Sequence, residues 1–322
     1  MIGNEAETAP LLSTRVAPDL AGKRLDLVLA ELFDGYSRSR LQRWIRDGRV
    51  TLDGKPCRAK DKVWGGETIR LQPVMEEEVS AKAQAIALDI LFEDDSLLVV
   101  NKPVGLVVHP AAGNPDGTLL NALLHHQPKL SQVPRAGIVH RLDKETSGLL
   151  VVAKTLQAQT SLVEQLQARS VRREYRAIVQ GVLTAGGRVD EPIGRHPVNR
   201  LKMAVTESGK PAVTHYRVLQ RFRAHSYLRV NLETGRTHQI RVHMAHIQHP
   251  LMGDPLYGGR LKLPAGASEA LRETLRGFRR QALHALRLEL QHPMSGEILS
   301  WEAPLPEDMQ QLLSVLQEDA AA

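Results

Sequence analysis

The stretch "AGIVHRLDKETSGLLVVAK", residues 136–154, places one aspartate among charged and small polar residues, directly before an apolar run. The apolar run, Leu149 to Val152, predicts a buried core strand that fixes the loop in front of it. An isolated aspartate in such a loop ordinarily caps a turn or pairs with a neighbouring Arg141 or Lys144 at the surface. The rest of the chain therefore has to decide whether Asp143 carries chemistry.

Length and composition predict a globular protein of about two domains. The chain has 322 residues, of which 42% are hydrophobic, enough for substantial cores. The single cysteine, Cys57, excludes an internal disulfide and a cysteine-based zinc cage. The first twenty residues lack the basic start and apolar core of a signal peptide, and no window of about 18 apolar residues occurs. We therefore expect a cytoplasmic protein with no membrane partner.

Residues 87–306 have the pattern of an α+β domain. Short strands such as "SLLVVNK" (96–102) and "SYLRVNLE" (226–233) alternate with turn signals and a few helices, one of them at 156–169 after a Thr155 cap. Regularly spaced βαβ units do not occur, so a mixed, mostly antiparallel sheet is favoured. Around this domain we expect segments of other kinds: a flexible N-terminus (1–16), a small domain (17–72), a linker (73–86) and a C-terminal helix and tail (307–322).

The positive charge of the chain gathers near the N-terminus. The net charge is +6, and residues 38–60 hold eight Lys and Arg against two Asp, which is also +6. Apolar residues at helical spacing in 25–32 and 41–45 predict two short helices, and an Asp-Gly pair at 53–54 predicts a hairpin. A solvated helix face is the ordinary interpretation of such a run. The scarcity of acidic residues at i+4 spacing favours a polyanionic partner instead.

The order helix, helix, Asp-Gly hairpin in residues 17–72 resembles the ribosomal protein S4-type RNA-binding domain. Domains of this type recognise RNA mainly by shape and by phosphate contacts. The resemblance implies that exposed cations of this region contact RNA, and the candidates are Arg38, Arg40, Arg43, Arg49 and Lys55.

Four further motifs occur in one order along the chain: "KPVGLVVHP" (102–110), "HRLDKETSG" (140–148), "RREYRAIV" (172–179) and "LETGRTHQIRVHMAHIQHPLMGDPLYG" (232–258). Together they resemble the RluA family of pseudouridine synthases, and the resemblance covers nearly the whole chain. It implies an enzyme that isomerises uridine to pseudouridine with no cofactor. Within the family the likeness is to synthases of large-subunit ribosomal RNA. That likeness implies 23S rRNA, at the stem-loop called helix 69, in the large subunit or its assembly precursor, as the partner of a monomeric enzyme.

The family pattern implies three catalytic residues. Asp143 matches the catalytic aspartate, Tyr175 the active-site tyrosine that packs against the target base, and Arg236 the basic partner. The chemistry agrees, because a carboxylate can act as nucleophile or stabilise positive charge at the sugar, and an enclosed carboxylate needs a cation to stay ionised. Attack at C1′, attack at C6 and abstraction of a sugar proton remain open.

The resemblance also implies RNA contacts around the cleft. Arg141, two residues before Asp143, is placed to enter the space that a flipped nucleotide leaves. The other candidates for RNA contacts in this part of the chain are Lys102, His109, His140 and Arg241.

Three alternatives were weighed against this interpretation. Zinc binding by His238, His243, His246 and His249 is disfavoured, because no H-E-x-x-H pattern occurs and no acidic ligand lies in the run. A glycosidase would need two cooperating carboxylates, and only Asp143 has motif support. A non-catalytic rRNA-binding assembly factor is the remaining alternative, which retention of all three catalytic candidates argues against.

Overall fold

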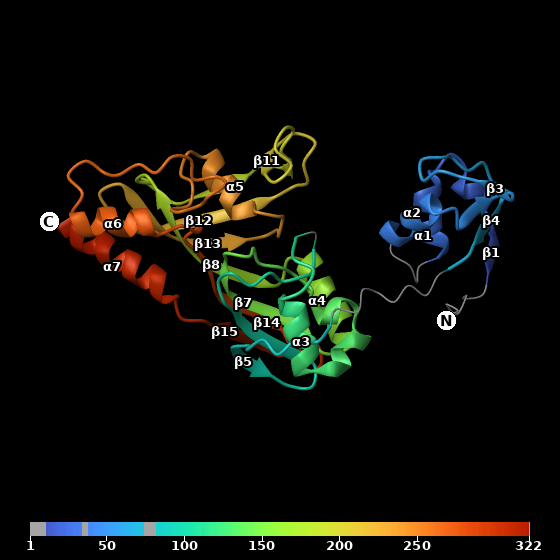
Figure 1. Cartoon of the computed structure of the whole chain (residues 1–322), viewed down its shortest axis with the longest axis horizontal. Coiled ribbons are helices and arrows are strands. Elements are labelled where there is room, and N and C mark those ends of the chain that lie inside the picture. Colours follow the sequence, from blue (N-terminus) through green and yellow to red (C-terminus); the bar gives the residue numbers. More distant parts are fainter. Residues whose placement is uncertain (1–10, 34–37, 74–81, 112, 322) are drawn as a thin grey trace, which may run out of the picture. The chain divides into compact units, whose positions relative to one another are not determined.

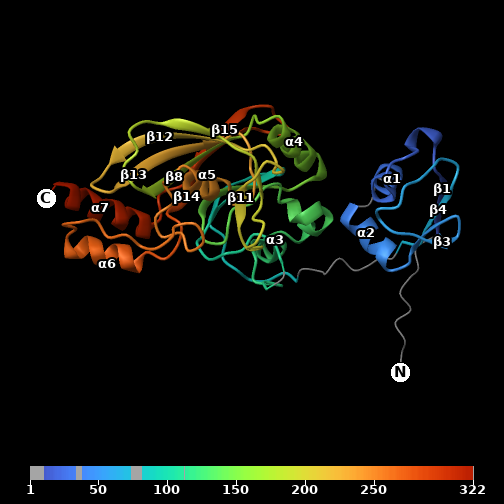
Figure 2. The same cartoon turned by 90° about the horizontal axis from the view of Figure 1, so that it is seen from above.

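The structure is a computed structural model that describes residues 11–33, 38–73, 82–111 and 113–321. The side chains of residues 39 and 40 also lie outside the description. The chain forms two compact units, residues 1–80 and 81–322, drawn in blue and in cyan to red in Figures 1 and 2. Both units combine helices with mainly antiparallel strands, as the sequence predicts.

The N-terminal unit is a four-stranded sheet with two helices. Its elements are β1 (Leu12–Arg15), a 3-10 turn (Pro18–Leu20), α1 (Leu25–Leu32), α2 (Arg38–Arg46), β2 (Val50–Leu52), β3 (Lys55–Pro56) and β4 (Thr68–Leu71). The strand order is β1-β4-β2-β3. Asp53 and Gly54, both with positive φ, make the expected tight turn between β2 and β3. Apolar residues of both helices pack with those of the sheet into one core around the fully buried Trp44.

Two of the expected boundaries differ from the structure. Residues 12–15, placed in a flexible N-terminus, form β1 and pair with β4; a four-residue strand with alternating exposure carries too weak a pattern to find. The end of the expected linker belongs to the second unit, because the amide of Gln84 donates to the carbonyl of Asn121 at 3.0 Å and Ile86 packs against that unit's core.

The second unit is built on a nine-stranded sheet. Its strands are β5 (Ile90–Glu93), β6 (Leu97–Lys102), β7 (Ser147–Ala153), β8 (Arg172–Gln180), β9 (Gly187–Asp190), β12 (Val213–Arg221), β13 (His225–Leu232), β14 (Leu283–Gln291) and β15 (Ile298–Glu302). A separate hairpin joins β10 (Ile193–Arg195) to β11 (Met203–Val205). The helices are α3 (Leu119–His126), α4 (Leu156–Gln167), α5 (Gln239–His246), α6 (Glu269–Gly277) and α7 (Glu307–Ala321).

Strand β7 lies within residues 136–154, the stretch of sequence that also carries Asp143. The sheet order is β5-β6-β7-β14-β8-β13-β12-β9, with β15 also on β14, and β7–β14 is its parallel pair. Gly148 permits this pairing, since a Cβ there would lie 2.2 Å from the carbonyl oxygen of Ala285. Strand β7 is buried along its whole length, which explains its continuous apolar run.

Helices cover both faces of this sheet (Figure 2). Leu150 and Val152 of β7 face the cluster that contains residues of α3 and α5. Leu149 and Val151 face the opposite cluster, with α4. Helices α6 and α7 pack together in a further cluster beside β8. The strand that follows Asp143 is therefore held from both sides, so it is a rigid support for the loop before it.

In the described part of the chain, no helix combines the length and apolar character needed to cross a membrane.

Candidate active site

The loop that carries Asp143 is fastened to three other segments. The buried Lys102 donates from Nζ to the carbonyl oxygen of Lys144 at 3.1 Å, and the amide of Gly105 donates to the same oxygen at 2.9 Å. From the start of β14, the side chain of Gln281 donates to the hydroxyl of Thr146 at 3.1 Å. The loop also closes on itself, because the amide of Thr146 donates to the carbonyl of Asp143 at 3.0 Å. These bonds fix where the carboxylate points.

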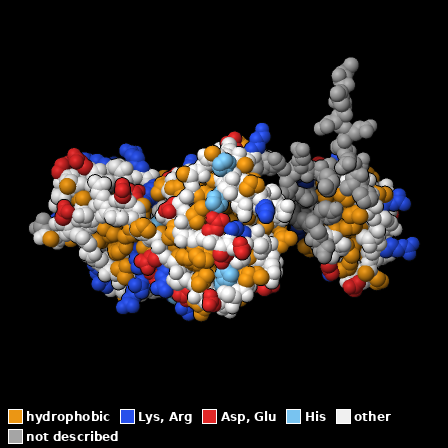
Figure 3. Space-filling model, turned by 90° about the horizontal axis from the view of Figure 1, so that it is seen from below, with side chains coloured by type: hydrophobic (Ala, Val, Ile, Leu, Met, Phe, Trp, Pro, Cys, Tyr) orange, Lys and Arg blue, Asp and Glu red, His pale blue; other side chains and the backbone are white. Residues whose placement is uncertain are grey.

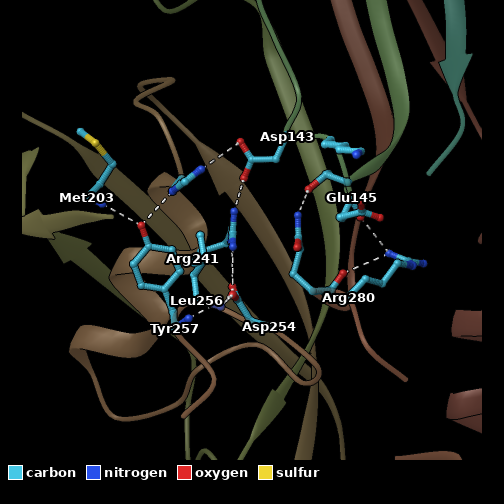
Figure 4. A network of polar contacts seen from close by, with 12 residues as sticks. Asp143, Glu145, Met203, Arg241, Asp254, Leu256, Tyr257 and Arg280 are labelled. Carbon is cyan, nitrogen blue, oxygen red and sulfur yellow. Dashed lines mark hydrogen bonds and ion pairs between the residues drawn. The ribbon is translucent and has the colours of Figure 1, made fainter. Parts of the chain in front are cut away.

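Asp143 is bound by an arginine that a second aspartate holds (Figure 4). Nη1 of Arg241, on α5, donates to Oδ2 of Asp143 at 2.9 Å. Nε and Nη2 of Arg241 donate to the two carboxylate oxygens of Asp254 at 2.7 and 2.9 Å. The Arg241 side chain is 5% exposed, that of Asp254 0% and that of Asp143 17%. Only Asp143 of the three is therefore accessible to a substrate.

Burial would lower the pKa of Arg241, but the bonds and charges of Asp254 and Asp143 outweigh it and raise that pKa above its ordinary value. The guanidinium is a permanent cation beside Asp143, and it lies in an environment of low polarity where its charge acts strongly. Arg241 is thus a fixed hydrogen-bond and charge partner for the one carboxylate of the pair that a substrate can reach.

A second chain of contacts reaches Asp143 from the β10–β11 hairpin. The amide of Met203 donates to the hydroxyl of Tyr257 at 2.8 Å, and that hydroxyl lies 2.8 Å from Nδ1 of His238. Nε2 of His238 is 3.9 Å from Asp143. The pKa of His238 is lowered, first by burial, although the carboxylate of Asp143 works against this. His238 is therefore a mainly neutral group facing Asp143 at pH 7.

Tyr175 and Arg173 come from alternate positions of β8 on the same face. Tyr175 is 6% exposed and its ring belongs to the sheet core. Its pKa is raised by burial and by Asp143, while Arg173 lowers it, so the hydroxyl stays protonated at neutral pH. Arg173 is buried and lines the same cavity, and its Nε has no hydrogen-bond partner among the described residues.

These side chains line one cavity of about 590 Å³, within the size range of small-molecule sites. Its wall includes a catalytic candidate from each of three segments, Asp143, Tyr175 and Arg236, together with His238 and Arg241. Asp254 is outside this lining. The cavity thus presents one available carboxylate between an aromatic ring and cations.

The sequence assignment of the basic partner was wrong. Arg236 lines the cavity, but its Nε donates to the carbonyl of Pro211 at 3.1 Å, and the guanidinium bonded to Asp143 is that of Arg241. Arg241 was expected to contact RNA; it lines the cavity, but its side chain is 5% exposed and Nε, Nη1 and Nη2 all donate to carboxylates. The two arginines lie five residues apart in one motif, and the turn at His238, with φ of 57°, decides which of them enters the site.

Two more residues that were expected to contact RNA make structural contacts, and of these two His140 also lines the cavity. Lys102 is 1% exposed and its ammonium also donates to the carbonyls of Pro103 and Leu106; burial lowers its pKa to about 8. Nε2 of His140 accepts from the amide of Val151 at 3.2 Å. Burial, with Arg173 nearby, lowers the pKa of His140 to about 3, so the ring accepts this bond as a neutral group. Both residues support the Asp143 loop.

The rim of the cavity carries cations that are available to RNA. Arg141 and Arg135 are exposed and line the opening with His109. Burial and these two arginines lower the pKa of His109. Arg135 and Ala136 both have positive φ, 56° and 50°, which non-glycine residues rarely adopt. Sequence analysis missed Arg135, Arg173, Asp254 and Tyr257; the last two lie in the quoted 232–258 motif, in which Asp254 is the one aspartate and so could have been considered as a partner of its arginines.

The cations of the N-terminal unit are arranged less simply than predicted. Arg43, Arg49 and Lys55 are exposed, and Figure 3 shows Lys and Arg side chains projecting from the edge of this unit. Arg38 is only partly available, because its Nη2 lies 2.6 Å from the buried Asp26. The side chain of Arg40 lies outside the described residues.

The histidines considered for zinc bind protein groups separately. His243 lies between the hydroxyl of Thr214 and the carbonyl of Glu191, each at 2.9 Å, and His249 lies 2.9 Å from the carbonyl of Gln180. Among the described residues, no three His, Cys, Asp or Glu side chains gather as a metal site.

Comparisons with known proteins identify the family of the chain. A family model described as RNA pseudouridylate synthase matches residues 96–246, and the S4 domain model matches residues 23–69. The chain is 61% identical to "Ribosomal large subunit pseudouridine synthase D" of Xanthomonas campestris pv. campestris, over 96% of this chain and 94% of that one. The protein of the same name from Escherichia coli K12 is 59% identical, with coverage of 96% and 95%.

Solved structures give the same family at lower similarity. Human RNA Pseudouridylate Synthase Domain Containing 4 aligns with a TM-score of 0.57 and 28% identity, over 71% of this chain and 92% of that chain. Human RNA Pseudouridylate Synthase Domain Containing 1 aligns with a TM-score of 0.53 and 25% identity, over 73% and 96%. With this similarity and its own motifs, the chain belongs to the RluA family of RNA pseudouridine synthases, alongside the ribosomal large subunit pseudouridine synthase D proteins.

Proposed function

We propose that this pseudouridine synthase isomerises uridines of 23S ribosomal RNA in the large subunit, with Asp143 as the catalytic carboxylate. The observation that carries the proposal is the Asp143–Arg241–Asp254 arrangement, in which two carboxylates share one buried cation and only Asp143 faces the cavity. The names of the relatives supply the substrate class.

The reaction breaks the N-glycosidic bond of a uridine, turns the uracil and rejoins it through C5. Asp143 acts as nucleophile or stabilises positive charge at the sugar, and the hydrogen bond from Nη1 of Arg241 holds its carboxylate in place. The ring of Tyr175 packs against the base, and the cavity wall keeps the detached uracil beside the sugar. No redox change or group donor is required, so the reaction as proposed uses no cofactor.

A uridine has to leave its stack to enter the cavity. We infer that Arg141 on the rim fills the space that the nucleotide leaves, and that Arg135 and His109, which line the same cavity, contact the RNA backbone. Arg236 contributes to this cationic rim. Arg173, whose guanidinium charge lies in the cavity wall, favours a phosphate or carbonyl oxygen of the flipped nucleotide there.

The proposal extends to the setting of the reaction. We place the target in the helix 69 stem-loop, in the large subunit or its assembly precursor, and the enzyme in the cytoplasm as a monomer. Exposed cations of the S4 domain supply affinity by phosphate contacts. The alternative, a non-catalytic assembly factor, gives no reason for a carboxylate fixed by a buried arginine inside a cavity.

One measurement separates the enzyme from the assembly factor. Purified protein is incubated with 23S rRNA carrying tritium at C5 of uridine, and tritium released to water is counted. We expect release with turnover, because C5 loses its hydrogen when it bonds to the sugar. Binding of the rRNA without any release would support the assembly factor and exclude the enzymatic proposal.

A further inference from the structure

One tryptophan of the N-terminal unit lies on the surface. The side chain of Trp64 is 74% exposed, whereas Trp44 is fully buried. The turn that carries Trp64 is fixed, because its amide donates to Oε1 of Glu67 at 2.5 Å and the amide of Gly66 donates to the carbonyl of Val16 at 2.8 Å. Gly65, with φ of 92°, packs against Pro18. The indole is thus presented on a rigid support, which reduces the ordering that binding would require.

Cations lie on the same face as this indole. Arg24 and Lys62 are opposite each other in an antiparallel bridge. The bonds that flank the bridge, at 2.7 Å and 3.1 Å, make it a narrow pair whose side chains are neighbours. Lys62, Val63 and Trp64 are exposed, buried and exposed in turn. Lys62 and Trp64 therefore project to the same side of the chain.

A buried carboxylate fixes the position of two arginines at this face. Asp26 is fully buried, and it accepts from Nε of Arg24 at 3.1 Å and from Nη2 of Arg38 at 2.6 Å. Burial works to raise the pKa of Asp26, but the bonds from Arg38, Gln42 and Arg24 outweigh it and bring that pKa to about 2. The two arginine side chains are still 49% and 47% exposed, so each keeps donors on its solvent side.

We propose that Trp64, with Arg24, Arg38 and Lys62, binds an unpaired nucleotide of the RNA substrate. The base stacks on the indole, and the adjoining phosphates contact the guanidinium and ammonium groups. The inference rests on the proposed function, which supplies the RNA substrate. It adds a contact with single-stranded RNA to an S4 domain that otherwise recognises RNA mainly by shape and phosphate contacts. A solvated basic face explains the cations but not a fixed, exposed indole among them.

The test uses the full-length protein with 23S rRNA. Trp64→Leu removes the stacking ring and keeps an apolar side chain, Trp64→Phe keeps a ring, and Leu11→Ala removes another exposed apolar side chain of this unit, one that is 54% exposed. We expect Trp64→Leu to weaken binding about 5- to 100-fold, Trp64→Phe to weaken it less, and Leu11→Ala to leave it unchanged.

Salt dependence distinguishes stacking from charge. Trp64→Leu should lower affinity equally at every salt concentration, whereas Lys62→Gln should reduce the slope of log affinity against log salt by about 0.7 to 0.9. RNA should also quench the tryptophan fluorescence of the parent protein, and this quenching should be absent in Trp64→Phe, because the variant lacks the exposed indole. Leu11→Ala, which lies outside the proposed contact, should also keep the parent's turnover at saturating RNA.

Two outcomes would overturn the inference. One is parent-like affinity of Trp64→Leu for 23S rRNA. The other is a loss of affinity only for assembled subunits and not for protein-free rRNA, which would identify a protein partner for Trp64. The parent protein's tritium release is measured in the same series, so failure of this contact is distinguishable from failure of the proposed function.

Discussion

At the scale of single residues, the strongest expectation concerns Asp143. Asp143→Asn keeps the shape of the side chain and removes the charge that the reaction needs. We expect turnover to fall at least about 10⁴-fold with folding and RNA affinity retained. Single-turnover tritium release, with thermal unfolding as the folding control, measures both. Turnover within tenfold of the parent would contradict the assignment.

Arg241 and Arg236 form a matched pair for a second prediction. Arg241→Lys keeps a charge, but one ammonium cannot span Asp143 and Asp254 as the guanidinium does. We expect kcat to fall by about 10² or more, while Arg236→Lys keeps kcat within about fivefold of the parent because its Nε contacts only a carbonyl. Rates at saturating RNA and urea unfolding of both variants provide the comparison. Equal losses would restore Arg236 as the partner.

The same pair shows where sequence reasoning reaches its limit. Asp143 and Tyr175 follow from motif and chemistry, and the need for a cation follows from the enclosed carboxylate. Which arginine supplies that cation depends on the left-handed turn at His238, which no residue type announces. Lys102 shows a related limit, since it donates to three backbone carbonyls and lies outside the cavity lining. A polar residue in a motif has the same appearance in the sequence whether it faces a ligand or supports a loop.

At the scale of elements, the spacing of apolar residues predicts a helix or strand correctly where the element buries one face or all of its surface. The helices α1 and α2 have regular apolar spacing, and β7 has an unbroken apolar run, so all three were predicted. Strand β1 was not, because "LSTR" owes its place to pairing with β4, more than fifty residues away in the sequence. Periodicity reports what a segment buries, whereas pairing at a sheet edge depends on a partner that the segment itself does not encode.

The junction of the Asp143 loop with β7 gives a prediction about pH. His140 must be neutral to accept from Val151, and its folded pKa of about 3 lies below the unfolded value of about 6.5. The unfolded chain therefore binds a proton that the folded protein does not. This contribution to stability is complete above pH 6.5 and is lost as the pH falls toward 3.

As the pH falls from 6.5 to 5, protonation of His140 in the unfolded chain should lower the free energy of unfolding by about 2 kcal/mol. Each pH unit in this range is worth about 1.4 kcal/mol. His225 and His284, each with a pKa lowered to about 4 mainly by burial, act in the same direction. Urea unfolding at pH 7.5, 6 and 5 of the parent and of His140→Gln tests this. The variant should lose less stability on acidification, and parallel curves would show that His140 is protonated in the folded protein.

At the scale of the whole molecule, the chemistry should be independent of metal ions in the protein. The histidines that lie in one motif bind hydroxyl and carbonyl groups separately. We therefore expect tritium release to be unchanged after exhaustive dialysis against a zinc chelator, with Mg²⁺ returned for RNA folding. Activity lost in chelator and restored by zinc would contradict a mechanism based on Asp143 alone.

The division into two units also separates affinity from chemistry. Arg43, Arg49 and Lys55 are exposed residues of the S4 domain, whereas every residue that lines the cavity belongs to the second unit. If each of the three neutralises one phosphate, replacing all with Ala should flatten the slope of log affinity against log salt by roughly 2 to 3. Turnover at saturating RNA should stay near that of the parent, because uniform binding favours ground state and transition state alike.

Arg38 is left in place, since its loss would leave the buried Asp26 with one ion-pair partner fewer. Binding titrations at several salt concentrations decide the matter: an unchanged slope would make these cations a solvated surface, and a reduced kcat would place them in the catalytic machinery.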